Sequence, residues 1–539
     1  MRAATARWRA RALAPVVLAA AGCGGDRGCR DAPGPAPGPP ALVVRITDGP
    51  DGPPVPARLT LFAGDEPVRW GVRDFLGGRR QANGYCWVAP GALATWDGLI
   101  LPWGEATIPA DAHCGADPWL VPGTYRVWAW RGLEYQPWEA TVALGERRVE
   151  LTIPLERAFD PGDAIAADLH VHAAASPDST VPKLIRVLTM AASGIRVVAL
   201  SDHNWNGDLD DEIALTGLAP WIASIASNEL GSDWVHAGVY PVTIDRAAPR
   251  GGSPSEDDTR SWSAARVMAW GRGQPGRPIV QINHPRYRVN ALFDVAGWDG
   301  VSWPPPFALD FDAVEVLAGT TVFNLPGDRR LDDGVRDFYT LIDHGVLVAG
   351  VGNSDTHHLD GIRDGLSRTY VFVDDPRTAP FDQDAFVDAV RARRAIATTG
   401  PWLDVEATGD GAGVAGPGQI LHAPGGVVHL DVAVAQARFS RADRLRVLVG
   451  TGDGARIVHD VAVPPGDGWR GRLDVTLPRD GWIGVDVGGE EPLPWAMTGN
   501  LHSEEGRPGA VPFAIINPIL VDADADGWWR LGLADVGVP

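Results

Sequence analysis

Two histidines and an aspartate occupy alternate positions in the segment "ADLHVH". Asp168, His170 and His172 are each two residues apart, and in a β-strand this spacing sends all three side chains to one face. Imidazoles and carboxylates make a poor apolar core but good ligands for a divalent cation. The segment therefore predicts one part of a metal site, whose other ligands must come from elsewhere in the chain.

Further candidate site residues stand at or just after the ends of other apolar segments. In "ALSDHN", "IASNEL", "WVHAGVY", "IVQINHPR" and "VLVAGVGNSDTHH" they are Asp202, His203, Glu229, His236, His284, Arg286, Asp355 and His357. A single histidine in a loop is usually just solvated. With His170 and His172, however, six of the 13 histidines lie at such positions, which chance does not easily produce. Buried polar groups without partners lose their hydration, and cations would compensate for this. Because the set contains no cysteine, it favours Zn²⁺, Mn²⁺ or Fe²⁺ over a thiolate zinc site.

These segments belong to a region, residues 163–400, in which strands and helices alternate. "TVPKLIRVLTMAASG" predicts a helix followed at once by a buried strand, and "SAARVMAWGRG" and "DDGVRDFYTLIDHG" repeat the unit. The alternation is typical of an α/β barrel or an open parallel sheet. In both folds, chemistry collects at the carboxyl ends of the strands, so we expect the polar residues to converge there.

Both flanks of this region carry only β signals. Residues 42–157 and 401–539 contain short alternating apolar segments separated by turn residues, which is the pattern of β-sandwiches. The predicted fold class is therefore α/β plus all-β. The segment "DADADG" (522–527) has the aspartate spacing of a calcium loop but lacks the glutamate at its twelfth position, so a β-turn is favoured.

The N-terminus predicts export. Residues 1–22 combine an arginine-rich start with an apolar segment that is too short to span a bilayer. The small residues before Cys23 resemble a bacterial lipobox, which would leave Cys23 lipidated, although Ala20 replaces the usual leucine and an ordinary signal peptidase site stays open. A Pro/Gly linker follows over 23–41. We expect a periplasmic or outer-surface lipoprotein held to the membrane only by its lipid, with a soluble secreted protein as the alternative.

Export also sets the expectation for the remaining cysteines. Cys86 and Cys114 are the expected disulfide pair, because Cys29 lies in a loose Pro/Gly stretch. The alternative is that all three are free and buried. The net charge of -21 argues against a nucleic-acid partner, which needs a basic face. The expected ligand is a small molecule, and the oligomeric state is left open.

Five motifs taken together resemble the PHP (polymerase and histidinol phosphatase) superfamily. "DLHVH", "ALSDHN", "SNEL", "INHPR" and "GNSDTHH" follow one another in this order, and "ATTGPW" and "FAIINPILVDADADG" look like the CehA/McbA metallohydrolases within that superfamily. The resemblance implies a distorted (β/α)₇ barrel over 163–400, flanked by the two sandwiches, with two to three divalent metal ions. By motif, the implied ligands are His170, His172, Glu229 and Asp355 for one ion, Glu229, His236 and His284 for a second, and Asp178, His203 and His357 for a third. Many relatives have histidine at the position of Asp178.

The implied chemistry is hydrolysis by a metal-activated water. PHP relatives mostly cleave phosphoesters, which is the expected reaction, whereas the CehA/McbA namesakes cleave an aryl carbamate, so carboxyl or carbamate ester hydrolysis is the alternative. Asp202 is expected to orient His203 or to cap a loop. Arg286 is expected to grip an anionic substrate, or else to form a surface salt bridge. Glu315 also ends a strand but is not included in the predicted site.

Two rival functions share some of these sequence features. An amidohydrolase barrel also opens with "HxH", but many of those enzymes bridge two metals with a carboxylated lysine, and the only lysine, Lys183, lies at a predicted helix start. A lipid-anchored binding protein whose barrel is a relic is the alternative of another class. In such a protein some of the 22 tryptophans could stack against bound sugars. Many of them, however, lie in segments of alternating apolar residues, where packing in the core is the simpler explanation.

Overall fold

The computed structural model describes most of the chain after the predicted linker. The described residues are 40–68, 74–76, 79–81, 84–95, 98–112, 114, 121–145, 147–287, 289–302, 307–319, 330–359, 364–373, 380–409, 413–466, 468–498 and 510–537. The predicted signal peptide, Cys23 and nearly all of the linker lie outside them. No helix among the described residues has the length and apolar character needed to cross a membrane.

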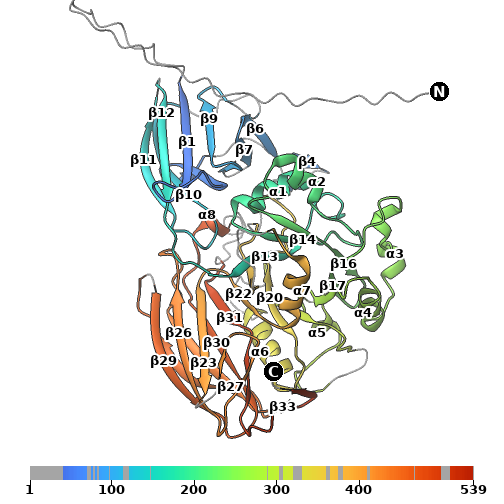
Figure 1. Cartoon of the computed structure of the whole chain (residues 1–539). Coiled ribbons are helices and arrows are strands. Elements are labelled where there is room, and N and C mark those ends of the chain that lie inside the picture. Colours follow the sequence, from blue (N-terminus) through green and yellow to red (C-terminus); the bar gives the residue numbers. More distant parts are fainter. Residues whose placement is uncertain are drawn as a thin grey trace, which may run out of the picture. The chain divides into compact units, whose positions relative to one another are not determined.

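The N-terminal region forms two sheets that enclose one apolar core (Figure 1). The smaller sheet has the order β12-β1-β9, and the main path of the larger has the order β11-β10-β2-β8-β7-β6. Their bounds are β1 Ala41–Asp48, β2 Ala57–Ala63, β6 Tyr85–Ala89, β7 Ala92–Thr95, β8 Gly98–Leu101, β9 Glu105–Pro109, β10 Gly123–Trp130, β11 Trp138–Leu144 and β12 Val149–Leu155. Alternate residues of β1 and β2, such as Val44 and Leu59, face this core, as the period-2 pattern predicts.

The predicted disulfide is present in this region. Cys86 in β6 is bonded to Cys114, with 6.1 Å between their Cα atoms and a sequence separation of 28. The pairing confirms the expectation for these two cysteines. A structural disulfide is typical of proteins from oxidising compartments.

The middle region contains the strands whose ends carry the predicted ligands, and they form two sheets. In the first, β13 (Ala164–Val171), β14 (Val197–Leu200) and β15 (Ala223–Ala226) run parallel, and β21 (Arg368–Phe372) lies antiparallel to β13. In the second, β18 (Ile279–Ile282), β19 (Ala313–Ala318) and β20 (Ala349–Asn353) run parallel, whereas β16 (Asn228–Gly231) and β17 (His236–Tyr240) form antiparallel pairs. Strand pairing among the described residues does not close these sheets into one barrel. The alternation of strands and helices is thus present, but the strands are not all parallel.

Helices pack against these sheets. They are α1 Lys183–Ala192, α2 Asp210–Thr216, α4 Ala264–Arg272, α6 Arg330–Asp343 and α7 Gln383–Arg391. Each has an apolar face: Leu188 of α1 and Val267 of α4 are fully buried, and Phe338 of α6 is 1% exposed. This packing holds the strands in place relative to one another, and with them the polar side chains at their ends.

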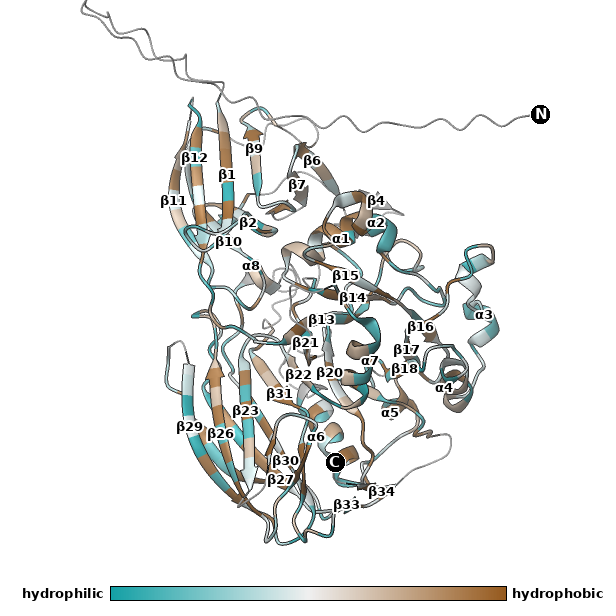
Figure 2. Cartoon of the chain, viewed as in Figure 1, coloured by the Kyte–Doolittle hydropathy of each residue, from teal (hydrophilic) through white to brown (hydrophobic). Residues whose placement is uncertain are grey.

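The C-terminal region is a second pair of facing sheets, and one of them continues into the middle region. The bounds are β22 Ala395–Thr398, β23 Trp402–Gly409, β24 Val414–Ala415, β26 Val427–Ala435, β27 Arg444–Gly450, β28 Arg456–Ala462, β29 Gly468–Thr476, β30 Gly481–Gly488 and β31 Phe513–Ile516. Strands β24, β23, β26 and β29 form one sheet, with hydrophilic and hydrophobic residues alternating along β23, β26 and β29 (Figure 2). Opposite them, β31, β30, β27 and β28 extend an 11-stranded sheet through the pairing of β31 with β22. The middle and C-terminal regions therefore share main-chain hydrogen bonds.

Candidate metal centre

All nine predicted metal ligands lie together. Most of them are at or after the carboxyl ends of parallel strands, whereas His236 begins the antiparallel strand β17 and Glu229 lies within β16. At their centre is Glu229 of β16, which is fully buried. Its Oε1 lies 3.1 Å from His170 Nε2, 3.3 Å from His236 Nδ1 and 3.4 Å from His284 Nε2. Its Oε2 lies 2.9 Å from His203 Nδ1 and 3.4 Å from His172 Nε2. One carboxylate thus contacts five imidazoles that come from segments far apart in sequence.

Two further carboxylates complete the cluster. Asp355 Oδ1 lies 3.2 Å from His170 Nε2 and 3.3 Å from His172 Nε2. Asp178 Oδ2 lies 3.1 Å from both His203 Nε2 and His357 Nε2. Four overlapping groups have ligand atoms close enough to share an ion: His170–His172–Asp355, His170–Glu229–His284, His203–Glu229–His236 and His172–Asp178–His203–His357. Relative to the assignment implied by the resemblance, His172 also approaches the third group, and His203 also approaches the second.

The spacing of these atoms fits metal coordination better than hydrogen bonding. A charge-assisted hydrogen bond between nitrogen and a carboxylate is about 2.7–2.9 Å long, whereas two ligands at about 2.05 Å from a tetrahedral zinc are about 3.3 Å apart. Nearly all the contacts above lie between 3.1 and 3.4 Å. Among the described residues, His172 Nε2, His236 Nδ1, Glu229 Oε2 and Asp355 Oδ1 are also buried without a hydrogen-bond partner. Buried polar atoms without partners are costly, so the residues present fit divalent cations.

The backbone around the cluster takes unusual conformations that aim these side chains. The pairing of β13 with β14 is irregular between Asp168 and Val171, just where the histidines of β13 begin. Positive φ angles occur at His284 (28°), Asp355 (52°) and Asn204 (51°). Such conformations are rare for residues other than glycine and cluster at functional sites.

A set of polar partners holds the outward nitrogens of the histidines. His170 Nδ1 donates to Glu315 Oε1 at 2.8 Å, and His357 Nδ1 donates to the carbonyl oxygen of Asp355 at 2.9 Å. Ser176 Oγ donates to Asp178 at 2.7 Å and lies 3.1 Å from His172 Nδ1. In His170, His172 and His357 one ring nitrogen has such a partner and the other faces the cluster, as in known metal sites. His203 differs, because both of its ring nitrogens face cluster carboxylates.

Glu315 of β19 is a site residue that the sequence prediction left out. Besides His170, it accepts hydrogen bonds from the backbone N–H of His284 at 2.6 Å and from Asn353 Nδ2 at 2.8 Å. Its side chain is fully buried. Its position at the end of a strand in "DAVEVLAG" was the available signal, but only the fold shows that it faces His170.

The electrostatics of the cluster keep its carboxylates ionised but do not make every imidazole neutral. Burial opposes ionisation of Glu229, but the imidazoles of His170, His203 and His236 hold the pKa of its carboxyl well below its usual range. Burial and the adjacent His357 lower the pKa of His172 to about 3, so this imidazole is neutral at pH 7. Ionised carboxylates and neutral imidazoles are the forms that bind cations. Although burial opposes it, the adjacent carboxylates raise the pKa of His170, His203, His284 and His357, so these four release a proton when they bind a cation.

Asp202 lies beside the cluster, but its observed contact is with a loop. Its Oδ1 accepts the backbone N–H of Ala173 at 2.6 Å, which fixes the turn directly after His172. Burial raises the pKa of Asp202 to about 7. No hydrogen bond joins its carboxylate to His203 among the described contacts, so the geometry favours the loop-capping alternative.

The prediction that Arg286 grips substrate is not supported by its contacts. Its Nε donates to Asp337 at 2.6 Å, its Nη1 to Asp294 at 3.2 Å, and its Nη2 to the carbonyl oxygen of Trp298 at 3.0 Å. All three nitrogens are therefore engaged within the chain, and two carboxylates neutralise the charge. Arg286 is a structural ion-pair residue in this fold.

Two other sequence features can also be placed. Lys183 Nζ donates to the carbonyl oxygen of Asp208 at 2.8 Å, and no ion pair within 4.0 Å joins it to a cluster carboxylate among the described residues, which disfavours the amidohydrolase arrangement. In "DADADG", Asp522 accepts the backbone N–H groups of Ala525 and Gly527, and Asp524 accepts that of Asp526. These are turn contacts, as the favoured interpretation expects. Asp522 and Asp524 also have carboxylate oxygens close enough to one of Asp480 to share an ion, so the calcium alternative stays open.

A small cavity of about 220 Å³ adjoins the cluster. Its walls include the ligands Asp178, His203 and His236, together with Arg260 and Asn290. Arg260 is exposed and has one ion-pair contact, at 3.5 Å, with the exposed Asp257. A guanidinium on a weak surface ion pair is available to an anionic group entering this cavity.

No family model matches this chain, and a search of curated proteins found no match either. Its function must therefore be inferred from the geometry of the site.

Proposed function

We propose that the protein is an exported, metal-dependent hydrolase of the PHP superfamily, similar to the CehA/McbA metallohydrolases, and that its substrates are phosphoesters. The observation that carries this proposal is the Glu229 carboxylate in contact with five imidazoles, with unpartnered ligand atoms around it. A structural zinc site needs four ligands in one closed set. Nine ligands in overlapping groups are more than such a site uses and indicate a multinuclear centre.

The strand arrangement supports a distorted barrel of the PHP type. Two isolated parallel bridges link the two middle sheets, between Val171 and Thr356 and between His203 and Glu229. Both bridges lie at the cluster, where strand ends from the two sheets must meet. We propose that the two sheets together correspond to the (β/α)₇ barrel that the resemblance implies.

Divalent ions held by the nine ligands would lower the pKa of a bound water and polarise the scissile bond. The residues of the chain perform the positioning. Glu315 holds the tautomer of His170 through its Nδ1–H, so that Nε2 faces Glu229. Asp202 holds the turn that follows His172. These contacts place the ligands before substrate arrives, and such preorganisation lowers the cost of reaching the transition state.

Arg260 is the residue that favours a phosphoester over a neutral ester. It is the cationic side chain in the wall of the cavity beside Asp178, His203 and His236. A phosphate group whose leaving oxygen faces the cluster would place its remaining charge within reach of this cavity. Loss of Arg260 should then weaken the binding of a phosphoester but not of an uncharged ester.

The proposal is tested with p-nitrophenyl phosphate, bis-p-nitrophenyl phosphate, p-nitrophenyl acetate and an aryl carbamate. Activity should be greatest on a phosphoester, should be abolished by a chelator and should return with Zn²⁺ or Mn²⁺. Arg260→Ala should raise KM for the phosphoester about tenfold, whereas Arg246→Ala, which removes an exposed arginine paired with Asp211, should leave KM unchanged.

Other outcomes separate the alternatives. Activity confined to the carbamate or the acetate would favour the carboxyl or carbamate ester hydrolase. Activity that is indifferent to the chelator would contradict both hydrolase versions. A protein that binds metal but cleaves no substrate of either class would favour the non-catalytic binding protein.

A further inference from the structure

A second and larger cavity lies at the opposite ends of the same strands. Its volume is about 1200 Å³, and its walls include Ile165 at the start of β13, Arg196 just before β14 and Ala223 at the start of β15. Seven residues of extended chain separate Ile165 from His172, which corresponds to about 23 Å. This cavity is therefore separate from the candidate metal centre.

Two buried arginines line this cavity without a carboxylate partner. Arg368 is 1% exposed, and Arg131 is 6% exposed. Arg368 donates through Nε to Gly365 O at 2.8 Å and through Nη2 to Ser193 O at 3.1 Å. Arg131 donates through Nη1 to Ala191 O at 2.7 Å. All of these acceptors are neutral carbonyl groups, and no ion pair within 4.0 Å involves either arginine among the described residues.

Arg368 also has an unused donor. Its Nη1 is buried without a hydrogen-bond partner among the described residues. A buried cation normally has a counter-charge, because an uncompensated charge in a protein interior is costly. Glu134, Asp160 and Asp210 line other parts of the same wall. Glu134 accepts from Arg157 at 3.1 Å, and although burial lowers the pKa of Arg131, Glu134 raises it. None of these three carboxylates forms an ion pair within 4.0 Å with Arg368 or Arg131 among the described residues.

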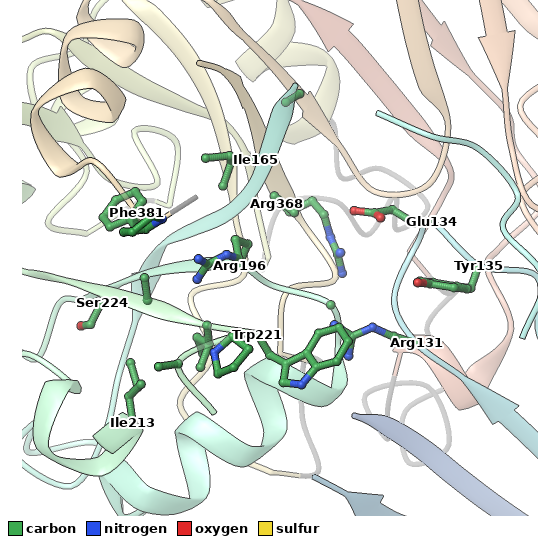
Figure 3. A pocket seen from close by; sticks show the side chains of 18 of the residues that line it. Arg131, Glu134, Tyr135, Ile165, Arg196, Ile213, Trp221, Ser224, Arg368 and Phe381 are labelled. Atoms are coloured by element: carbon green, nitrogen blue, oxygen red, sulfur yellow. The ribbon is translucent and has the colours of Figure 1, made fainter. Parts of the chain in front are cut away.

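One part of the wall is apolar and partly aromatic. Arg131 lies over the ring of Trp221 at 4.8 Å from its centroid, and Phe381, Ile213 and Ile165 contribute other parts of the lining. Figure 3 shows these side chains around the same space as Arg131 and Arg368. A ligand that satisfies both features has a charged head near the arginines and an apolar body against the aromatic wall.

We propose that this cavity binds an organic carboxylate with an apolar body, whose carboxylate balances the charge of Arg368 and Arg131. Cavities that bind small organic ligands combine apolar walls with a few placed polar groups in this way. The site is distinct from the proposed hydrolytic centre and does not depend on it.

The test uses fluorescence titration of the full chain with 4-(1-pyrenyl)butyrate and, as a neutral analogue of the same shape, 4-(1-pyrenyl)butanol. The acid should bind at least about tenfold more tightly than the alcohol, as expected for one charge-assisted hydrogen bond. Equal affinities would overturn the proposal, because the arginines would then contribute nothing.

Two substitutions locate the binding. Ala214 of α2 is exposed and lines the cavity, so Ala214→Trp should fill part of it and weaken the acid about tenfold. The matched control is Leu215→Trp, on the adjacent residue, which is 77% exposed and is not part of the lining; it should change the affinity less than about twofold. Equal effects of the two substitutions would place the acid elsewhere, including at the metal centre, and would overturn the proposal. Arg368→Met should weaken the acid and leave the alcohol unchanged. If Arg368→Met fails to fold, the comparison of Ala214→Trp with Leu215→Trp still shows whether the acid binds in this cavity.

Discussion

Replacement of Glu315 by glutamine should weaken metal binding although it replaces none of the proposed ligands. Glu315 Oε1 accepts from His170 Nδ1 and Asn353 Nδ2, and its Oε2 accepts from the backbone N–H of His284. In Glu315→Gln, one oxygen becomes an NH₂ group. If that group faces His284, two donors oppose one another, and in either orientation His170 loses its anionic partner.

The magnitude follows from these contacts. Substitution of a group that orients a metal-ligating histidine costs about 10- to 100-fold in metal affinity, which corresponds to about 1.4–2.7 kcal/mol. This agrees with the loss of one hydrogen bond to a charged group, at about 1.5–3 kcal/mol. We therefore expect the dissociation constant for Zn²⁺ to rise by about one to two orders of magnitude, while activity at saturating Zn²⁺ falls less.

The assay is a competition titration of the metal-free protein with Zn²⁺ against a fluorescent chelator of known affinity. The matched control is Asp486→Asn, which alters a carboxylate that is 1% exposed and accepts from Arg446 at 2.7 Å in the C-terminal sheet. This variant should lose stability and keep the Zn²⁺ affinity. Folded Glu315→Gln with an unchanged Zn²⁺ affinity would refute the reasoning, and so would an equal loss of affinity in the control.

Two more predictions concern ion pairs that contain none of the proposed ligands. Arg286→Met should lower the free energy of unfolding by about 2 kcal/mol, because it removes the 2.6 Å hydrogen bond to the buried Asp337 and leaves only Arg336 at 3.3 Å. It should leave KM for a phosphoester unchanged; a raised KM with unchanged stability in urea unfolding would restore the predicted role in substrate binding. Burial alone would raise the pKa of Asp364, but Arg186 and Arg58 lower it, so its contribution to stability is complete above the ordinary aspartate pKa near 3.9 and is lost as the pH falls below that value. Asp364→Asn should accordingly be less stable than wild type at pH 6 and differ less from it at pH 3 in the same urea assay, and an equal difference at both pH values would contradict this sign.

Much of the site could be predicted because its signal is local. The spacing of His170 and His172 requires only a strand, and ligands at strand ends meet whenever the strands share a sheet edge. Glu229 and Asp355 come from the other middle sheet, yet both lie within 3.4 Å of those histidines.

The remaining features depend on contacts that no short segment contains. Arg286 meets Asp337, 51 residues away, and the residues after "INHP" give no sign of this pairing. Glu315 acts on a histidine 145 residues earlier in the chain. The pairing of β22 with β31 joins residues about 120 positions apart, so that the sheet runs through the predicted boundary at 400. Such long-range contacts are decided by the packing of whole elements, which period and composition do not specify.

The most direct test of the central claim is the metal content of the purified, untagged protein by inductively coupled plasma mass spectrometry. The wild-type chain should retain two to three equivalents of Zn, Mn or Fe after dialysis. Glu229→Gln, which alters the carboxylate shared by the overlapping groups, should lose most of this metal while remaining folded. Less than one equivalent in the wild type, after reconstitution with each of the three metals, would contradict the account.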